Sequence, residues 1–338
     1  MILHGVPMPA RNRAASHYSS LITHHSSLIS MTGVVYKSTG SWYSVQDTEG
    51  RFWNARIKGI FKLDGITSTN PIAVGDTVEF EKENEGEGTV TITKITDRRN
   101  YINRQSPRGR HQHHIVAANL DQSLLLATIK DPRTSQGFID RFLVACEMYH
   151  VPAIVVFNKT DLYREKEWKI YDRLKEVYGA VGYRVFPISI KEAKGIAEVK
   201  EMLQDKVTLI SGHSGVGKSS FINAVMPGSN IKTQDVSGWS GKGMHTTTFA
   251  EMYDLPQGGK IIDTPGMREF GLVDVDREEL SGYFPEMRQR LNGCQFNNCQ
   301  HINELDCAIK EAVVNGEIDE DRYVNYVNIL ESLKTEKW

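Results

Sequence analysis

The sequence predicts a multidomain fold in which a small β-barrel is followed by an α/β domain and by a short helical region rich in cysteine. Three observations support this prediction. Residues 33–95 contain short runs of β-branched and aromatic residues separated by turn signals. Residues 123–263 alternate apolar strands with helical segments, as doubly wound α/β domains do. Three of the four cysteines crowd one short segment together with a histidine.

Composition and charge restrict the classes of function. The chain has 338 residues, 40% of them hydrophobic and 24% charged, which suits two or three globular domains. Its net charge is −2, so any contact with nucleic acid must come from local basic patches. No apolar run is long enough to cross a membrane. The clustered cysteines favour a metal over disulfides and a reducing compartment.

Residues 1–30 are predicted to be a disordered extension, with the working protein beginning at Met31. The stretch lacks Asp and Glu, is rich in serine and histidine, and has no helical or strand period. An acid-poor, serine-rich start also suits an organelle transit peptide, although Arg11 and Arg13 supply little positive charge.

Residues 31–103 are predicted to form a five-stranded barrel of the OB type, a common oligonucleotide binder. Strand-like runs lie at 34–36, 42–45, 52–57, 74–80 and 90–95. The aromatic residues of these runs can either stack on RNA bases or fill the barrel core, and they are Trp42, Tyr43, Phe52 and Trp53. The basic connector that follows, from Arg98 to His114, is either an exposed linker or a strip that contacts phosphate.

Residues 104–274 are predicted to form an α/β domain built around a phosphate-binding loop. Residues 212–219 fit the pattern G-x-x-x-x-G-K-[ST] between a strand at 207–210 and a helix from Ser220. The glycines let backbone N–H groups face phosphate oxygens at a helix N-terminus. Lys218 would reach the β- and γ-phosphates, and the Ser219 hydroxyl would bind Mg²⁺. The predicted phosphate-binding residues are Gly212, His213, Ser214, Gly215, Val216, Gly217, Lys218, Ser219 and Ser220.

The tetrapeptide Asn158, Lys159, Thr160 and Asp161 follows a predicted strand and indicates which base is bound. A carboxylate at Asp161 can accept two hydrogen bonds, from the N1–H and from the exocyclic amine of guanine. Adenine has neither donor, so it would leave a buried carboxylate unpaired. The stem of Lys159 can lie under the base. The motif therefore predicts a guanine nucleotide, GTP or GDP.

Asp263 and Gly266 form a D-x-x-G motif after a short strand, as in the γ-phosphate sensor of a GTPase. We expect Asp263 to hold Mg²⁺ through water and the Gly266 N–H to meet the γ-phosphate. Thr247, one of three neighbouring threonines, would complete the Mg²⁺ coordination. Met267 cannot activate water, so His245 is the candidate for positioning the attacking water. The predicted catalytic residues are His245, Thr247 and Lys218.

The order of the motifs indicates a circular permutation. In ordinary GTPases the phosphate loop comes first, and the N-K-x-D motif and a Ser-Ala-Lys-type base loop come last. Here residues 158–161 and the base-loop residue Ser189 precede residues 212–219. A fold with adjacent termini tolerates this rearrangement. The segment after Gly266 then runs directly into the C-terminal domain, which nucleotide state is expected to move as a rigid attachment.

Residues 275–338 are predicted to form a small helical domain around one structural Zn²⁺. Three thiolates and one imidazole leave no open position for water, and they belong to Cys294, Cys299, His301 and Cys307. Flanking residues 311–314 and 323–333 have helical patterns. A domain this small is expected to need the metal in order to fold.

Together these residues resemble the bacterial RsgA family, also called YjeQ. The resemblance rests on the OB-like start, on residues 158–161 ahead of 212–220, on residues 245–248 and 263–272, and on the Cys/His set. It covers roughly residues 31–338. It implies a cytoplasmic GTPase that binds the small ribosomal subunit and its rRNA and assists late maturation, with slow hydrolysis that the subunit stimulates. The family often has an arginine just before the His-Thr-Thr stretch, where this chain has Met244, so the basic charge of that loop rests on Lys242.

Two other classes of function stay open, and we expect a monomer in each case. A nucleotide-regulated RNA-binding module with incidental hydrolysis would bind RNA equally well with GDP or GTP. A metabolic P-loop ATPase or kinase would let ATP compete equally with GTP, which Asp161 argues against.

Overall fold

The computed structural model describes residues 30–57, 71–82, 88–105, 113–229, 250–264, 272 and 275–333. Within these ranges, no helix has both the length and the apolar character that crossing a membrane requires. The predicted extension, apart from Ser30, lies outside the described residues.

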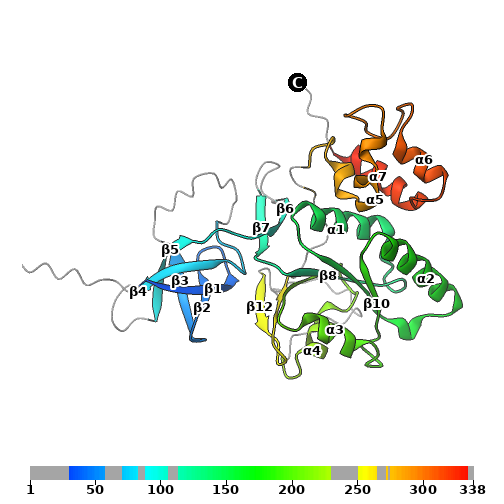
Figure 1. Cartoon of the computed structure of the whole chain (residues 1–338). Helices are drawn as coiled ribbons and strands as arrows, with labels where there is room; N and C mark the ends of the chain where they lie inside the picture. The colour runs from blue at the N-terminus through cyan, green and yellow to red at the C-terminus, as the bar shows by residue number, and fades with distance from the viewer. Residues whose placement is uncertain are drawn as a thin grey trace, which may run out of the picture.

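The first five strands close into a barrel with OB topology (Figure 1). Around the barrel they are β1 (Met31–Ser38), β2 (Tyr43–Asp47), β3 (Phe52–Ile57), β5 (Thr89–Ile95) and β4 (Thr77–Lys82). β4 pairs again with β1; β3 and β5 run parallel, and the other barrel pairs are antiparallel. Alternate residues point inward, so the barrel core contains Val35, Val45, Val78, Phe80 and Ile92. The predicted OB-type barrel is confirmed.

The barrel is joined to the α/β domain by a hairpin and a close backbone approach. β6 (Tyr101–Gln105) pairs with β7 (His113–Ala118), so the predicted boundary after residue 103 falls within β6. At Gly75, where φ is +93°, a Cβ atom would lie 2.1 Å from the Ala118 carbonyl oxygen. Arg98 pairs with the buried Asp76 (Nε–Oδ1, 2.6 Å), and its side chain is 11% exposed. Arg98 is therefore part of the joint and belongs neither to an exposed linker nor to a phosphate-contacting strip.

The central sheet has the order β10-β9-β8-β11-β13-β12. Its strands are β8 (Gln122–Ala127), β9 (Ala153–Phe157), β10 (Arg184–Pro187), β11 (Val207–Ser211), β12 (Glu251–Asp254) and β13 (Lys260–Asp263). All neighbours pair in parallel except β12, which is antiparallel to β13. The carboxyl ends of the parallel strands thus meet at one edge, where the ligand loops of such sheets lie.

Helices cover both faces of this sheet (Figure 1). α1 (Gln136–Met148) and α2 (Glu165–Ala180) pack on one face, and α3 (Ile196–Leu203) and α4 (Lys218–Val225) pack on the other. Within β8, Leu125 and Ala127 contribute to the first core, whereas Leu124 and Leu126 contribute to the second. A strand buried on both faces has a continuous apolar run, and in β8 this run is Leu124 to Ala127.

The C-terminal domain is helical and packs on α1. Its elements are η2 (Leu280–Tyr283), α5 (Pro285–Arg288), η3 (Leu291–Gly293), α6 (Ala308–Val314) and α7 (Glu320–Ser332). Phe284, Tyr326 and Leu330 are fully buried in its core, which also contains Val144 of α1. The two helices predicted here are confirmed, and both begin about three residues before the predicted segments. The Asp319 side chain caps α7 by accepting from the Arg322 N–H.

One contact that the sequence did not predict joins the barrel to the central sheet. β1 pairs antiparallel with β12 at Lys37 and Glu251, so one hydrogen-bonded sheet runs through both domains. The Lys37 ammonium lies 3.2 Å from the Glu251 carboxylate. The Tyr36 hydroxyl donates to Asp254 at 2.7 Å. The paired residues lie far apart in the sequence, so no local pattern predicts that β1 and β12 pair.

Candidate functional site

The phosphate loop (residues 212–219) connects β11 to α4, as the motif predicts. Its glycines adopt positive φ angles of 144° at Gly212, 84° at Gly215 and 100° at Gly217. A Cβ atom at Gly212 would lie 2.4 Å from the Leu126 carbonyl oxygen, and one at Gly217 would lie 2.6 Å from the amide nitrogen of Asn158. Glycine is therefore required both by the backbone conformation and by the neighbouring atoms.

Two charged side chains at this loop interact with each other: Lys218, which is part of the loop, and Asp263, which lies beside it at the end of β13. The Lys218 ammonium donates to the carbonyl oxygens of Gly212 (2.6 Å) and His213 (3.1 Å), and burial lowers its pKa. Asp263 ends β13 beside Ile210 of β11, and burial raises the pKa of its carboxyl. Its Oδ1 atom is buried and has no hydrogen-bond partner among the described residues. An orphaned carboxylate oxygen beside a phosphate loop fits a water-mediated contact to Mg²⁺.

The base motif (residues 158–161) is attached directly to the phosphate loop. The amide of Asn158 donates to the Val216 carbonyl at 2.8 Å, and its oxygen accepts from the Ile190 N–H at 3.3 Å. The Ser189 hydroxyl donates to Asp161 Oδ1 at 2.8 Å. Two motifs separated by more than 50 residues, together with the loop at Ser189, therefore form one site. The sequence predicted that these segments form one site, but the motif does not predict that Asn158 bonds to the phosphate loop.

Lys159 is held in place by a loop that the sequence analysis did not single out. Its backbone is left-handed, with φ at 66°, and its ammonium donates to the Asp131 carbonyl at 2.5 Å. Asp131 belongs to the loop between β8 and α1 (residues 128–135, the β8–α1 loop). The Pro132 ring of the same loop lies against Gly215, where a Cβ atom would be 3.4 Å from it. The β8–α1 loop therefore contacts both the base motif and the phosphate loop.

Three predicted residues fall outside the described part of the chain. His245 and Thr247 lie within residues 230–249, and Gly266 lies within residues 265–271. Their roles remain predictions.

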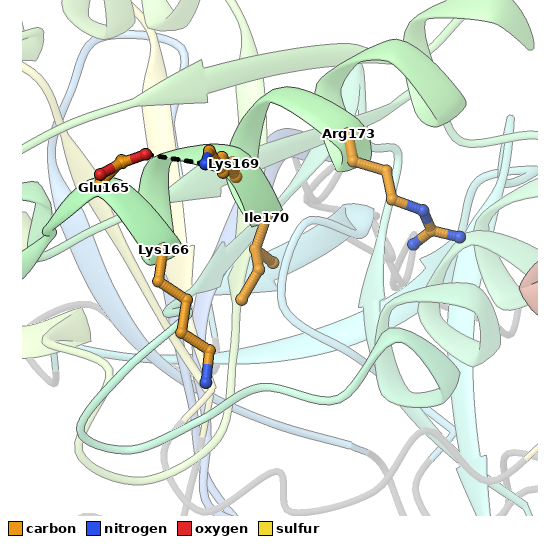
Figure 2. A pocket seen from close by; sticks show the side chains of 5 residues that line it. All are labelled: Glu165, Lys166, Lys169, Ile170 and Arg173. Atoms are coloured by element: carbon orange, nitrogen blue, oxygen red, sulfur yellow. Dashed lines mark ion pairs between the residues drawn. The ribbon is translucent and has the colours of Figure 1, made fainter.

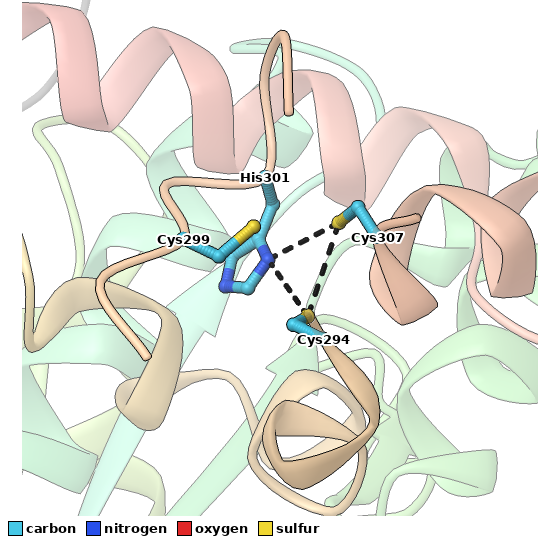
Figure 3. Close-up of side chains that lie close together, drawn as sticks. All are labelled: Cys294, Cys299, His301 and Cys307. Carbon is cyan, nitrogen blue, oxygen red and sulfur yellow. Dashed lines mark hydrogen bonds between the residues drawn. The ribbon is translucent and has the colours of Figure 1, made fainter. Parts of the chain in front are cut away.

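The predicted metal ligands do come together (Figure 3). One ligand atom from each of Cys294, Cys299, His301 and Cys307 lies within 4.8 Å of the others. His301 Nδ1 is 3.3 Å from the Cys307 sulfur and 3.5 Å from the Cys294 sulfur, and these two sulfurs are 4.0 Å apart. A tetrahedral Zn²⁺ requires about 3.6 Å between nitrogen and sulfur and about 3.8 Å between sulfurs, from ordinary Zn–N and Zn–S bond lengths.

The surroundings of the metal cluster favour a cation. Its three cysteines are free thiols. Burial, together with the neighbouring Cys307 and Cys294, raises the pKa of Cys299 to about 12, so this thiol needs a nearby positive charge to become a thiolate near pH 7. Glu304 belongs to none of the sequence motifs. Its carboxylate accepts hydrogen bonds from the backbone N–H groups of Gln300, Ile302 and Asn303 and shapes the loop that carries His301.

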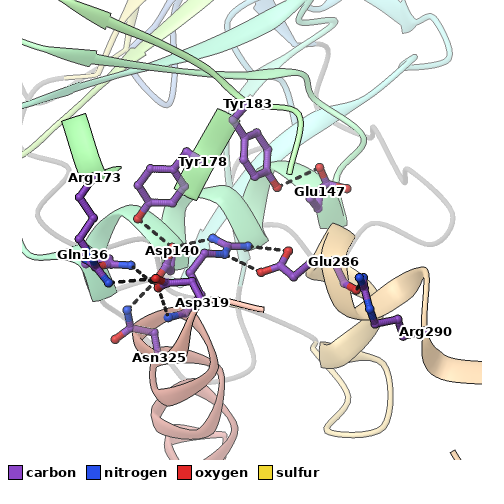
Figure 4. A network of polar contacts seen from close by, with 11 residues as sticks. Gln136, Asp140, Glu147, Arg173, Tyr178, Tyr183, Glu286, Arg290, Asp319 and Asn325 are labelled. Carbon is purple, nitrogen blue, oxygen red and sulfur yellow. Dashed lines mark hydrogen bonds and ion pairs between the residues drawn. The ribbon is translucent and has the colours of Figure 1, made fainter. Parts of the chain in front are cut away.

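A buried charge network attaches the C-terminal domain to the α/β domain (Figure 4). Arg322 of α7 is 1% exposed and donates to Asp140 of α1 at 2.7 Å and to Glu286 of α5 at 2.5 and 3.0 Å. Asp140 also accepts from Tyr178 (2.9 Å) and Asn325 (2.6 Å). Burial raises the pKa of Asp140 to about 6, although Arg322 opposes this shift. In the sequence, the only sign of this network is that Asp140 lies among apolar residues on the buried face of α1.

The aromatic residues of the barrel divide into core and surface. Tyr43 is 2% exposed and belongs to the core. The Trp53 indole donates to Asp47 at 2.9 Å and lies near the Arg51 and Lys82 cations. Trp42 and Phe52 are 48% and 56% exposed.

A pocket of about 460 Å³ lies elsewhere, along α2 (Figure 2). It is lined by Glu165, Lys166, Lys169, Ile170 and Arg173, and Lys169 pairs with Glu165 at 2.7 Å. None of these residues belongs to a nucleotide or metal motif, so the pocket is separate from the chemistry described above.

Comparison with known proteins gives one consistent family. The profile of the RsgA GTPase family matches residues 95–273, and the RsgA N-terminal domain matches residues 32–90. The small ribosomal subunit biogenesis GTPase RsgA of Flavobacterium psychrophilum is 51% identical, over 89% of this chain and 93% of that protein. RsgA 2 of Bacteroides thetaiotaomicron is 48% identical, over 91% of this chain and 99% of its own length.

Two solved structures are similar over nearly the whole chain. YjeQ from Thermotoga maritima is 34% identical and has a TM-score of 0.74, covering 91% of this chain and 100% of its own. YloQ, described as a circularly permuted GTPase, is 27% identical and has a TM-score of 0.69, covering 96% of this chain and 99% of its own.

Proposed function

Because the chain belongs to the RsgA GTPase family, we propose that it is a GTPase of small ribosomal subunit biogenesis, which binds this subunit and assists its late maturation. It hydrolyses GTP to GDP and phosphate. We further propose that the subunit stimulates this hydrolysis. The observation that carries the proposal is the hydrogen bond between Asn158 and Val216, which joins a guanine-type base motif to a phosphate loop in permuted order.

In this proposal each motif residue has a physical task. Asp161, oriented by the Ser189 hydroxyl, accepts from the N1–H and amine of guanine, and Lys159 lies along the base. Backbone N–H groups of the phosphate loop, including those up to Ser220, bind the phosphates. Lys218 exchanges its two carbonyl partners for phosphate oxygens and offsets the charge that develops during phosphoryl transfer.

The hydrolytic step relies on groups around the γ-phosphate. Ser219 and Asp263 would hold Mg²⁺, which neutralises charge on the β- and γ-oxygens when it is bound. Thr247 and the Gly266 N–H are proposed to meet the same end of the nucleotide. His245, as a neutral imidazole, is proposed to orient the attacking water. All three lie outside the described residues, so mutagenesis must test them.

The barrel and the C-terminal domain are proposed to contact rRNA. Among the described residues of the barrel, Trp42 and Phe52 are exposed aromatic side chains available for stacking, whereas Tyr43 lies in the core and Trp53 is engaged with Asp47. The Cys/His cluster is proposed to hold one structural Zn²⁺, since its spacing suits a closed tetrahedral site. We propose a cytoplasmic monomer with residues 31–103, 104–274 and 275–338 as domains.

The test is GTP turnover by residues 31–338, alone, with small ribosomal subunits and with large subunits as a control. We expect strong stimulation by small subunits only. Turnover that ignores the subunits would contradict the ribosomal part of the proposal. Binding of RNA that is equal with GDP and GTP would instead favour an RNA-binding module with incidental hydrolysis.

Base recognition is tested by Asp161→Asn. An amide in place of the carboxylate loses the bond to the guanine amine but can donate to the carbonyl that xanthine carries at that position. We expect the variant to lose GTP affinity by roughly 100-fold or more and to accept XTP. If the wild-type protein binds ATP as well as GTP, the guanine assignment is wrong.

A further inference from the structure

Thr134 and His213 make a contact that none of the motifs explains. His213 is the second residue of the phosphate loop, and Thr134 lies in the β8–α1 loop, 79 residues earlier. Thr134 Oγ1 and His213 Nε2 are 2.7 Å apart. The His213 ring also meets the Phe138 ring edge to face, with 5.6 Å between centroids. A side chain of the phosphate loop is thus held from outside the motif.

The hydrogen-bond partners determine which ring nitrogen of His213 carries the proton. Thr134 Oγ1 accepts from the Thr128 N–H at 3.0 Å, and Thr134 is 7% exposed, so its own hydroxyl proton remains for Nε2. Nδ1 lies 3.2 Å from the Ser214 carbonyl oxygen, which can only accept. The neutral imidazole that satisfies both contacts has its proton on Nδ1 and accepts through Nε2. Burial lowers the pKa of His213, and the Lys218 and Lys159 ammonium groups lower it further, which favours this neutral form.

The bond to the Ser214 carbonyl fixes a peptide unit of the phosphate loop. In a trans peptide the C=O and the following N–H point in opposite directions. When the imidazole holds the Ser214 oxygen on its own side, the Gly215 N–H points to the other side of the loop. Gly215 has φ at 84° and few intrinsic restraints, so this peptide would otherwise rotate easily.

We propose that Thr134, acting through the Nδ1–H tautomer of His213, is a positioning residue that aims the Gly215 N–H at a nucleotide phosphate. The chain of contacts runs from Thr134 Oγ1 to His213 Nε2 and from His213 Nδ1 to the Ser214 carbonyl. The inference rests on the proposed GTPase function. It adds the β8–α1 loop to the phosphate site and gives that loop a specific task.

The test compares Thr134→Val with Thr134→Ser and with Ser135→Ala. Valine removes the hydroxyl at nearly constant volume, and serine restores it. Ser135 is the N-cap of α1, where its side chain accepts from the Phe138 N–H, so Ser135→Ala weakens the same turn without touching His213. We expect Thr134→Val to weaken GDP binding and raise KM for GTP about tenfold, with a smaller change in kcat, because the lost contact serves ground and transition states alike. Thr134→Ser and Ser135→Ala should stay within about twofold of wild type.

His213→Phe is a second route if Thr134→Val folds poorly. It keeps the ring against Phe138 and loses both nitrogen contacts, so we expect the same tenfold loss with an unchanged Tm. The ring ¹⁵N shifts of His213 in the GDP complex provide an independent readout, which should place the proton on Nδ1. Equal losses in Thr134→Val and Ser135→Ala, or a proton on Nε2, would overturn the inference. Wild-type protein that binds no GDP would instead refute the proposed function.

Discussion

Replacing Arg322 with methionine tests the attachment of the C-terminal domain to the α/β domain. Arg322 is the shared donor for two buried carboxylates, Asp140 at 0% exposure and Glu286 at 5%. Methionine keeps much of the apolar stem and removes the charge. Both carboxylates then lose their ion-pair partner within a site from which water is excluded.

The magnitude follows from how each carboxylate can respond. Breaking a buried ion pair by removing one partner costs about 3–5 kcal/mol. Asp140 retains Tyr178 and Asn325 as donors, and burial already holds its pKa at about 6. Protonating Asp140 at pH 7 costs about 1.4 kcal/mol for each unit by which the pH exceeds its folded-state pKa, and this limits the loss of stability at Asp140. Glu286 loses both of its side-chain donors, so we expect a total near the lower end, about 3 kcal/mol.

Hydrogen exchange of the α7 amides measures this cost locally, which suits a multidomain chain better than one global transition does. Arg173→Met is the matched control, since Arg173 also bridges to the start of α7 through Asp319 but is 47% exposed. Its loss should cost less than about 1 kcal/mol. If Arg322→Met also costs less than this, the network does not attach the domain.

A pH series gives a second check on the same reasoning. Arg322 lowers the pKa of Asp140, so removing Arg322 raises that pKa further above the wild-type value of about 6, and above pH 6 the folded variant binds more protons than the folded wild type. The stability of the variant should therefore rise relative to wild type as pH falls from about 8 to 6. If the stability difference between the variant and wild type does not change with pH, protonation of Asp140 does not contribute to it.

Three further predictions concern the joint, the barrel and the metal. Gly75→Ala should destabilise the chain by more than about 2 kcal/mol in urea unfolding. Gly40→Ala, at a similar φ of 90° but with open space around it, should cost about 1 kcal/mol. Equal costs would mean that the contact between Gly75 and the Ala118 carbonyl does not require glycine. The Trp53 indole, followed by Arg51, lowers the pKa of Asp47 to about 2, so Asp47→Asn should lower stability at pH 7, and the difference should vanish as pH falls from about 4 to 2. If the Cys/His cluster holds a structural Zn²⁺, chelation should abolish near-ultraviolet signals of the C-terminal domain, and Cys299→Ser should do the same; a chelated protein that keeps its tertiary signals contradicts a structural zinc.

The parts of the site that the sequence predicted are those that local chemistry determines. The phosphate loop, the base motif and the Cys/His set each hold their residues within about 15 positions, and each needs particular residue types. The five barrel strands followed from runs of β-branched and aromatic residues between turn signals, and the barrel has them. Such patterns depend on backbone geometry that any short segment carries with it.

The contacts that the sequence did not reveal join distant segments through single ordinary residues. Thr134, Arg322 and Lys37 have no unusual neighbours in the chain, and their partners lie 79, 182 and 214 residues away. The aromatic residues were also ambiguous, because alternation alone does not say which of Tyr43 and Trp42 faces inward. Tertiary packing decides these cases, and it is absent from any local window.

The buried network also limits how far a change of nucleotide can move the C-terminal domain relative to α1. The sequence predicts that the segment after Gly266 moves this domain as a rigid attachment. Coupling between a ligand site and a distant element is typically worth about 1–3 kcal/mol, which does not exceed the expected cost of breaking the Arg322 contacts. We therefore expect the domain to stay on α1 when GTP replaces GDP, and the α7 amides to exchange alike in both complexes. A nucleotide-dependent change there of more than about tenfold would mean that the network opens during the cycle.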